Sequence, residues 1–235
     1  DGEAATYWQA GHSRPAWVGE TAMEMVGRVG LCARLDPGTA TMCLVDNTYR
    51  PGNYFAYAHV ADIFDTDPYV RPAAGREVNF PFVQWATSLC RAAAAPRPVW
   101  ITLAMGWGSG NCRTLTEAEE RIMALYALGA GARGINYFIH SGGSWSIWDG
   151  IRITGRREEG LVLREGVGRL NRQLARAGPW LARSCPADLV RAAPEGVSAS
   201  TLLVADEAII LVAVNTLSVG KGEEFEAKPI ADAQV

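Results

Sequence analysis

The side chains best suited to chemistry in this sequence are carboxylates that follow short apolar runs. Such runs predict buried strands, and in parallel α/β folds the functional side chains gather at the C-terminal strand ends. Asp65 and Asp67 lie two positions apart on one predicted strand, so they face the same side of it. Repulsion between two carboxylates on one face can raise the pKa of one of them and so provide an acid and a base. The other candidate acids are Glu3, Asp46 and Asp149.

Each of these acids also has a structural interpretation that the sequence leaves open. Asp67 precedes Pro68 and can cap the turn there. Asp65 can pair with a neighbouring Arg or Lys.

Aromatic and polar residues gather after the same predicted strands. The strand 134–139 opens into a glycine-rich loop, and glycine-rich or turn-rich segments also follow two other strands. Aromatic rings in such loops can stack on the apolar faces of sugars, and packing in the core is the alternative. For the histidine, the alternative is a structural role with its hydrogen bonds made within the protein. The resulting candidates for substrate binding are Asp46, Asn47, Tyr69, Trp107, His140, Trp145, Trp148 and Asp149.

The elements that position these residues alternate along the chain. Apolar runs predict strands over 41–45, 61–67, 99–104 and 134–139, and helical spacing predicts helices over 19–35, 54–60, 78–95, 113–131 and 160–182. This order is typical of parallel β/α units. From residue 198 two strands, 200–204 and 208–215, predict a β hairpin, so we divide the chain into an α/β domain (1–197) and the start of an all-β domain (198–235).

Four local patterns mark helix starts and helix faces. The pairs Thr114–Glu117 and Thr116–Glu119 have capping-box spacing. Two sets of apolar residues mark helix faces. They are Met23, Val26, Leu31 and Leu35 in the first helix, and Leu163, Val167, Leu170 and Leu174 in the last.

Composition narrows the functional class. The formal charge of −3 over 235 residues gives no basic footprint for nucleic acid, and no apolar run reaches the roughly 18 residues of a membrane helix. The five cysteines are scattered, which argues against a disulfide framework and a zinc site, and we expect Cys32 and Cys43 to be small core residues. No phosphate-binding glycine motif follows a strand, so no nucleotide cofactor is expected. The three histidines are scattered like the cysteines, so no metal is expected.

Three segments resemble the C-terminal half of glycoside hydrolase (β/α)8 barrels, many of them bacterial. They are Asp67-Pro68-Tyr69, RPVWITLAMG (97–106) and TEAEERIMALYALGAGARGINYF (116–138). The resemblance covers roughly residues 36–216. It implies a partial TIM-barrel-like domain made of barrel strands five to eight, with strands one to four before Asp1 and a β-sandwich beginning after residue 198. The chain would then be a fragment of a longer protein.

The resemblance also implies a function, the hydrolysis of glycosidic bonds in a poly- or oligosaccharide. Asp67, Asp65 and Glu3 are the expected catalytic carboxylates, and an extracellular or periplasmic location would follow. In the large retaining clan a nucleophilic Glu follows strand seven, but here that strand ends Leu-Ala-Met-Gly-Trp (103–107). A non-catalytic carbohydrate-binding protein on the same scaffold is therefore the second hypothesis. The sugar, the linkage and the oligomeric state stay open.

Overall fold

The computed structural model describes residues 15–45, 52–70, 77–105, 115–138, 157–220 and 225–230. The helices are α2 (Pro15–Leu35), α3 (Asn53–Tyr57), α4 (Pro81–Ala94), α5 (Glu117–Gly129) and α6 (Arg157–Leu181). The strands are β1 (Met42–Val45), β2 (Ile63–Thr66), β3 (Val99–Ala104), β4 (Gly134–Phe138), β5 (Ser184–Ala187), β6 (Val197–Val204), β7 (Ala208–Asn215), β8 (Val219–Gly220) and β9 (Phe225–Glu226).

The first four strands form one parallel sheet in the order β1-β2-β3-β4. The register aligns Leu44 with Asp65, Asp65 with Trp100, and Trp100 with Gly134. A helix lies between each strand and the next, which confirms the predicted mixed α/β fold with parallel β/α units.

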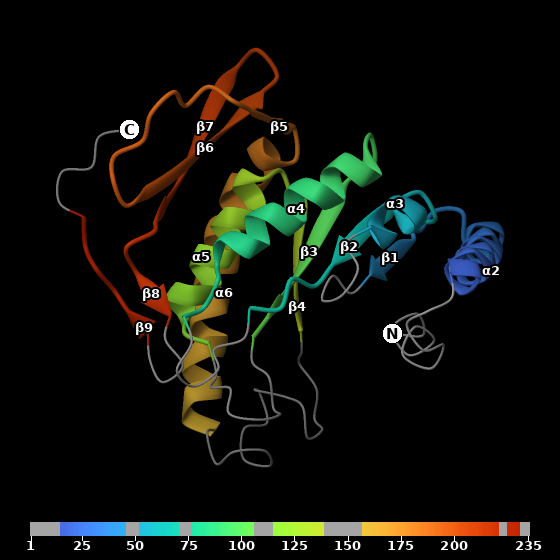
Figure 1. The fold of residues 1–235 in the computed structure, drawn as a ribbon, viewed down its shortest axis with the longest axis horizontal. Coiled ribbons are helices and arrows are strands. Elements are labelled where there is room, and N and C mark those ends of the chain that lie inside the picture. The colour runs from blue at the N-terminus through green and yellow to red at the C-terminus, as the bar shows by residue number, and fades with distance from the viewer. Residues whose placement is uncertain are drawn as a thin grey trace.

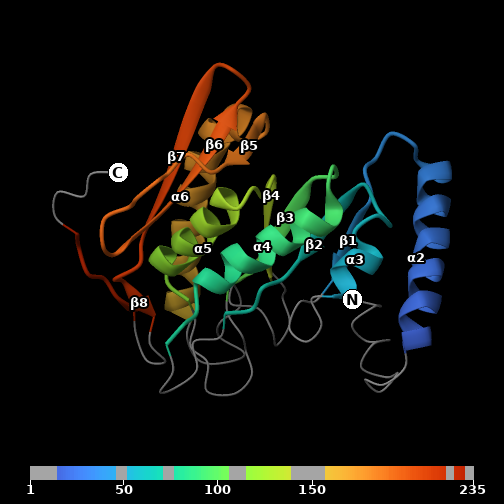
Figure 2. The same cartoon turned by 45° about the horizontal axis from the view of Figure 1, so that its top comes forward.

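The helices form a continuous layer along this sheet (Figures 1 and 2). Each helix from α2 to α6 contacts the next one in the chain. Fully buried side chains from the strands, Phe64, Ile101 and Leu103, belong to the same core cluster as Val83 of α4 and Met123 of α5. The apolar alternate residues of the strands therefore face the helices and form the core.

Helix α5 has a start and an end that its sequence dictates. Thr116 accepts a hydrogen bond from the Glu119 backbone N–H, and the Glu119 carboxylate accepts one from the Thr116 backbone N–H. This is the capping box predicted from the spacing. Thr114, of the other predicted pair, lies outside the described residues. At the far end Gly131 takes a φ of +100°, a left-handed conformation that strains residues with a Cβ.

The face predicted for the first helix is wrong. Met23 and Leu35 of α2 are 71% and 76% exposed, whereas Met25 and Val29 contact the core. Cys32, expected in the core, is also exposed. The helix carries apolar residues around most of its circumference, so spacing alone does not select the buried side. By contrast, Cys43 of β1 is buried, as are Leu163, Val167 and Leu170 of the predicted α6 face.

A second sheet follows α6. The predicted hairpin is confirmed as antiparallel β6 and β7, and both strands contact α5. The sequence did not reveal β5, which pairs antiparallel with β6 and aligns Cys185 with Leu203. A two-stranded ribbon of β8 and β9 lies near the start of α4, where Val78 N–H donates to the Gly220 carbonyl over 2.7 Å.

Candidate functional site

The parallel sheet has a polar face opposite its helix-covered face. Strand alternation puts Asp65, Thr102 and Asn136 on one side, away from the core residues Phe64, Ile101 and Leu103. They come from β2, β3 and β4 and meet through hydrogen bonds. We call Asp65, Thr102 and Asn136 the polar layer.

Asp65 is the centre of the polar layer. Its side chain is fully buried, and its Oδ2 accepts hydrogen bonds from Thr102 Oγ1 over 2.8 Å and from Asn136 Nδ2 over 3.0 Å. Its Oδ1 has no hydrogen-bond partner in the part of the chain that the structure describes. Burial raises the pKa of Asp65, and the hydrogen bonds from Thr102 and Asn136 oppose that rise.

The polar face is strongly concave. Asn136 Nδ2 of β4 lies 3.7 Å from the sulfur of Met42 of β1, although β2 and β3 lie between these two strands. In a flat sheet strands three places apart are separated by roughly 14 Å. The contact therefore requires the sheet to curl toward the side opposite the helices.

Trp100 also lies on this face and packs closely over the backbone of β4. A Cβ added at Gly134 would come within 2.4 Å of the Trp100 ring. Gly134 is therefore required for the approach of the indole ring to the strand.

Asp67 and Tyr69 follow the C-terminal end of β2, beyond the polar layer. Asp67 is 6% exposed. The Tyr69 ring meets the Phe138 ring of β4 edge to face, with centroids 6.3 Å apart and an interplanar angle of 75°. By alternation Phe138 is on the same face as Asn136, so the chain after β2 stays on the concave side.

A further buried carboxyl group lies at the start of α5. Glu120 is fully buried, and neither of its carboxyl oxygens has a hydrogen-bond partner among the residues described. Burial, followed by the nearby charge of Glu119, raises the pKa of Glu120 well above its ordinary value. Glu120 is not evident as a site residue from the sequence, because a Glu in the first turn of a helix normally marks only a favourable interaction with the helix dipole.

The structure describes three of the eleven predicted site residues. Asp65, Asp67 and Tyr69 all belong to the segment that forms and follows β2. Asp65 bonds Thr102 and Asn136 rather than the basic partner considered from the sequence. The others lie outside the described residues. They are Glu3, Asp46, Asn47, Trp107, His140, Trp145, Trp148 and Asp149.

Sequence reasoning missed Thr102 and Asn136. Both are polar residues inside otherwise apolar strands, VWITLA and GINYF. A polar residue in a buried strand needs a hydrogen-bond partner, and this requirement was the available signal.

No protein-family model matches the sequence, and no curated protein is significantly similar to it. Within the described part of the chain, no helix has the length and apolar character needed to cross a membrane. No cluster of three or more His, Cys, Asp or Glu among those residues is arranged to hold a metal ion.

Proposed function

We propose that this chain is the C-terminal half of a glycoside hydrolase-type (β/α)8 barrel, followed by the start of an all-β domain, and that it hydrolyses glycosidic bonds of a poly- or oligosaccharide. The observation that carries the proposal is the position of Asp67 and Tyr69 at the C-terminal end of β2, next to the polar layer, whose Asp65 and Thr102 are buried, on the concave face.

The strand order supports the barrel part of the proposal. Four parallel strands follow one another in chain order, β1-β2-β3-β4, with a helix in each connection. Right-handed crossovers in a sequential order put every connecting helix on one face, whereas doubly wound sheets reverse their order and cover both faces. A curled sheet with helices on one side is the arrangement from which barrels are built.

Asp67 is the residue we assign to the chemistry. It is almost completely buried at a strand end, and a carboxyl group at such a position can protonate a leaving group or act as a base or nucleophile. Asp65 lies deeper, and its two hydrogen bonds fit a role in positioning the strand end above it. We propose that the second carboxylate that hydrolysis needs comes from Glu3 or Asp149.

The aromatic side chains give the saccharide part of the proposal its physical basis. Tyr69 and Phe138 present adjacent rings at the ends of β2 and β4. Sugar rings carry apolar C–H faces that pack on such rings, while their hydroxyl groups bond nearby carboxylates. The predicted loop residues Trp107, His140, Trp145 and Trp148 would extend this surface.

A non-catalytic carbohydrate-binding protein is the second candidate, and a specific observation favours it. The penultimate strand of the proposed barrel, β3, runs into the buried apolar side chain of Met105 rather than into a carboxylate. The retaining clan has its nucleophile after that strand, so the resemblance is incomplete where the chemistry would require it.

One experiment separates the two candidates. Purified protein is incubated with a panel of soluble polysaccharides, and both the release of reducing ends and the retardation in affinity electrophoresis are measured. Hydrolysis supports the enzyme, whereas retardation without hydrolysis supports the binding protein. Neither hydrolysis nor retardation on any member of the panel would overturn both.

A further inference from the structure

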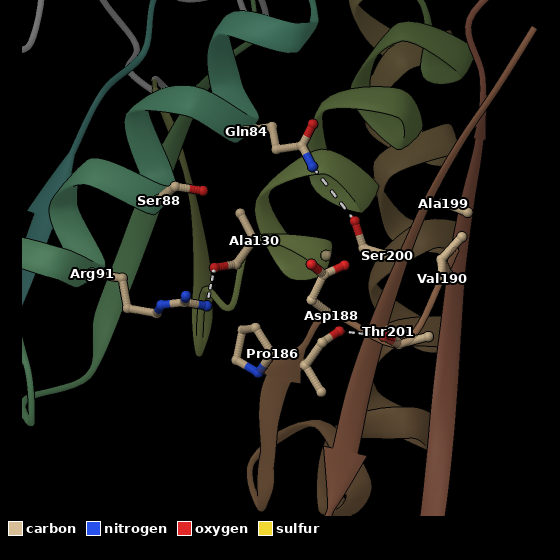
Figure 3. Close-up of a pocket in the computed structure, with 12 residues that line it drawn as sticks. Gln84, Ser88, Arg91, Ala130, Pro186, Asp188, Val190, Ala199, Ser200 and Thr201 are labelled. Carbon is tan, nitrogen blue, oxygen red and sulfur yellow. Dashed lines mark hydrogen bonds between the residues drawn. The ribbon is translucent and has the colours of Figure 1, made fainter. Parts of the chain in front are cut away.

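We propose that the protein has a second ligand site, for a small neutral saccharide, in a pocket between α4, the C-terminal end of α5 and the strands β5 and β6 (Figure 3). The pocket has a volume of about 520 Å³. It lies on the outer side of the helix layer, so it is separate from the concave face and does not depend on the function proposed for that face.

One wall of the pocket is a polar stripe of α4. Gln84, Ser88 and Arg91 occur at intervals of four and three residues, which puts them on one side of the helix. The opposite wall comes from the second sheet and includes Asp188 and Ser200. Figure 3 shows these side chains around a common space.

Arg91 is held in place by the end of α5. Its Nη1 donates to the Ala130 carbonyl oxygen over 2.9 Å. Gly131, with its φ of +100°, has no side chain at the point where a Cβ would be 2.8 Å from Nη1 and 2.5 Å from the Pro186 ring. This bond uses one of the five guanidinium N–H donors, and the others have no hydrogen-bond partner in the described part of the chain.

Asp188 supplies the acceptors. Its carboxylate makes neither a hydrogen bond nor an ion pair with any side chain that the structure describes, and it projects into the pocket (Figure 3). It is not within ion-pair distance of Arg91. The pocket therefore contains one positive and one negative group that do not neutralise each other directly.

The hydroxyl and amide groups complete the lining. Gln84 Nε2 lies 3.4 Å from Ser200 Oγ, a long hydrogen bond that joins α4 to β6 across the pocket. Ser88 is exposed on the pocket wall. Donors and acceptors thus alternate around the space, since the amide and both hydroxyl groups can act as either.

These properties select the class of ligand. The formal charges of Arg91 and Asp188 cancel, so a ligand with a net charge would leave one of them unmatched on binding. Each hydroxyl group of a saccharide both donates and accepts, which matches the mixed lining. A zwitterion such as a free amino acid is the competing class. The described lining contains no aromatic side chain, so binding would depend on hydrogen bonds.

The site can be tested by NMR titration of the ¹⁵N-labelled whole chain with glucose, galactose, mannose, xylose and N-acetylglucosamine, and in parallel with glycine and glutamine. The proposal expects at least one sugar to shift the backbone amides of Gly129, Ala130, Ser200 and Thr201. Asp188→Ala and Ser88→Ala should each weaken the binding of that sugar. For Asp188→Ala the affinity for the sugar should fall about tenfold or more, as expected when a hydrogen bond to a charged group is removed.

Asp206→Ala is the matched control, because Asp206 is an exposed acid in the turn between β6 and β7 and does not line the pocket. It should bind the sugar like the unmodified protein. The proposal is overturned if no sugar shifts the four amides, if only the amino acids do, or if Asp188→Ala and Ser88→Ala both bind like Asp206→Ala.

Discussion

Asn136 on β4 donates a hydrogen bond to Asp65 on β2, across the whole width of the intervening strand β3. In a flat sheet, strands with one strand between them are separated by roughly 10 Å. Side chains as short as Asp and Asn therefore meet across that strand only where the sheet curls. The Met42 sulfur near the same Asn136 amide shows that the curl extends to β1. This contact joins the shape of the sheet to its chemistry, because the concavity that brings the polar layer together also forms the surface below Asp67 and Tyr69.

The ionisation of Asp65 should make stability depend on pH in a defined direction. Burial raises the pKa of Asp65 above the ordinary 3.8, so the folded protein favours the protonated side chain. This preference stabilises the fold fully below about pH 3.8, and the stabilisation is lost as the pH rises through the folded-state pKa. Asp65→Asn cannot ionise. The free energy of unfolding of this variant, relative to the unmodified protein, should therefore increase from about pH 3 to about pH 7. Urea denaturation at several pH values measures this trend.

Asp206→Asn is the control for that series, because Asp206 is exposed and its substitution should leave the pH trend unchanged. A relative stability of Asp65→Asn that is flat or falls with rising pH would show that Asp65 is not desolvated in the folded protein.

The burial of Glu120 should also make stability depend on pH, in the same direction as for Asp65. Because burial and the neighbouring Glu119 raise the pKa of Glu120, the folded protein favours its neutral form. Glu120→Gln keeps the shape and removes the charge, so it should become more stable relative to the unmodified protein as the pH rises from about 4 to about 8. Thermal unfolding at a series of pH values measures this change. Glu195→Gln, at an exposed position outside the core, should show no trend.

The packing of Trp100 on β4 should make Gly134 intolerant of a side chain. A Cβ there would lie 2.4 Å from the indole ring, so Gly134→Ala should destabilise the fold by about 1–3 kcal/mol. Gly27 of α2 is the matched position, because nothing lies within 4 Å of an added Cβ. Gly27→Ala should stabilise by up to about 1 kcal/mol, since alanine is the better helix former. Equal effects of the two substitutions in chemical denaturation would rule out the close ring contact.

The capping box of α5 should contribute measurably to stability. Thr116→Ala removes the side chain that accepts from the Glu119 backbone N–H, and loss of such a cap costs about 1 kcal/mol. Thr216→Ala, an exposed threonine beyond β7, serves as the control and should change stability by less than about 0.5 kcal/mol. A Thr116→Ala variant as stable as this control in urea denaturation would show that the cap is dispensable.

The sequence predicted the elements better than it predicted their faces. The apolar runs at 99–104 and 134–139 correspond to β3 and β4, because short, mostly apolar runs next to proline or glycine are typical of strands in a parallel sheet. The exposed Met23 and Leu35 of α2 were misplaced, since a helix with apolar residues on several sides is oriented by its neighbours. Strand β5 was missed because Ser184–Ala187 contains a proline and no β-branched residue, so pairing with β6 and not propensity makes it a strand.

Only the part of the candidate site that lies within one short segment of the sequence could be predicted. Asp65, Asp67 and Tyr69 share one segment, so the alternation of a single strand relates them. The bonds of Asp65 to Thr102 and Asn136 join residues 37 and 71 positions apart. Such contacts depend on strand register and on sheet curvature, which no local pattern specifies.

The most direct test of the proposed function is the rate of reducing-end release by Asp67→Asn beside that of the unmodified protein, on the polysaccharide that the unmodified protein hydrolyses fastest. The substitution keeps the size of the side chain and removes its proton chemistry. We predict that the rate falls about 100-fold or more, the usual contribution of a general acid or base, while Asp206→Asn keeps the full rate. An Asp67→Asn variant that hydrolyses the substrate as fast as the unmodified protein would contradict the assignment of Asp67 and, with it, the account of the concave face as an active site.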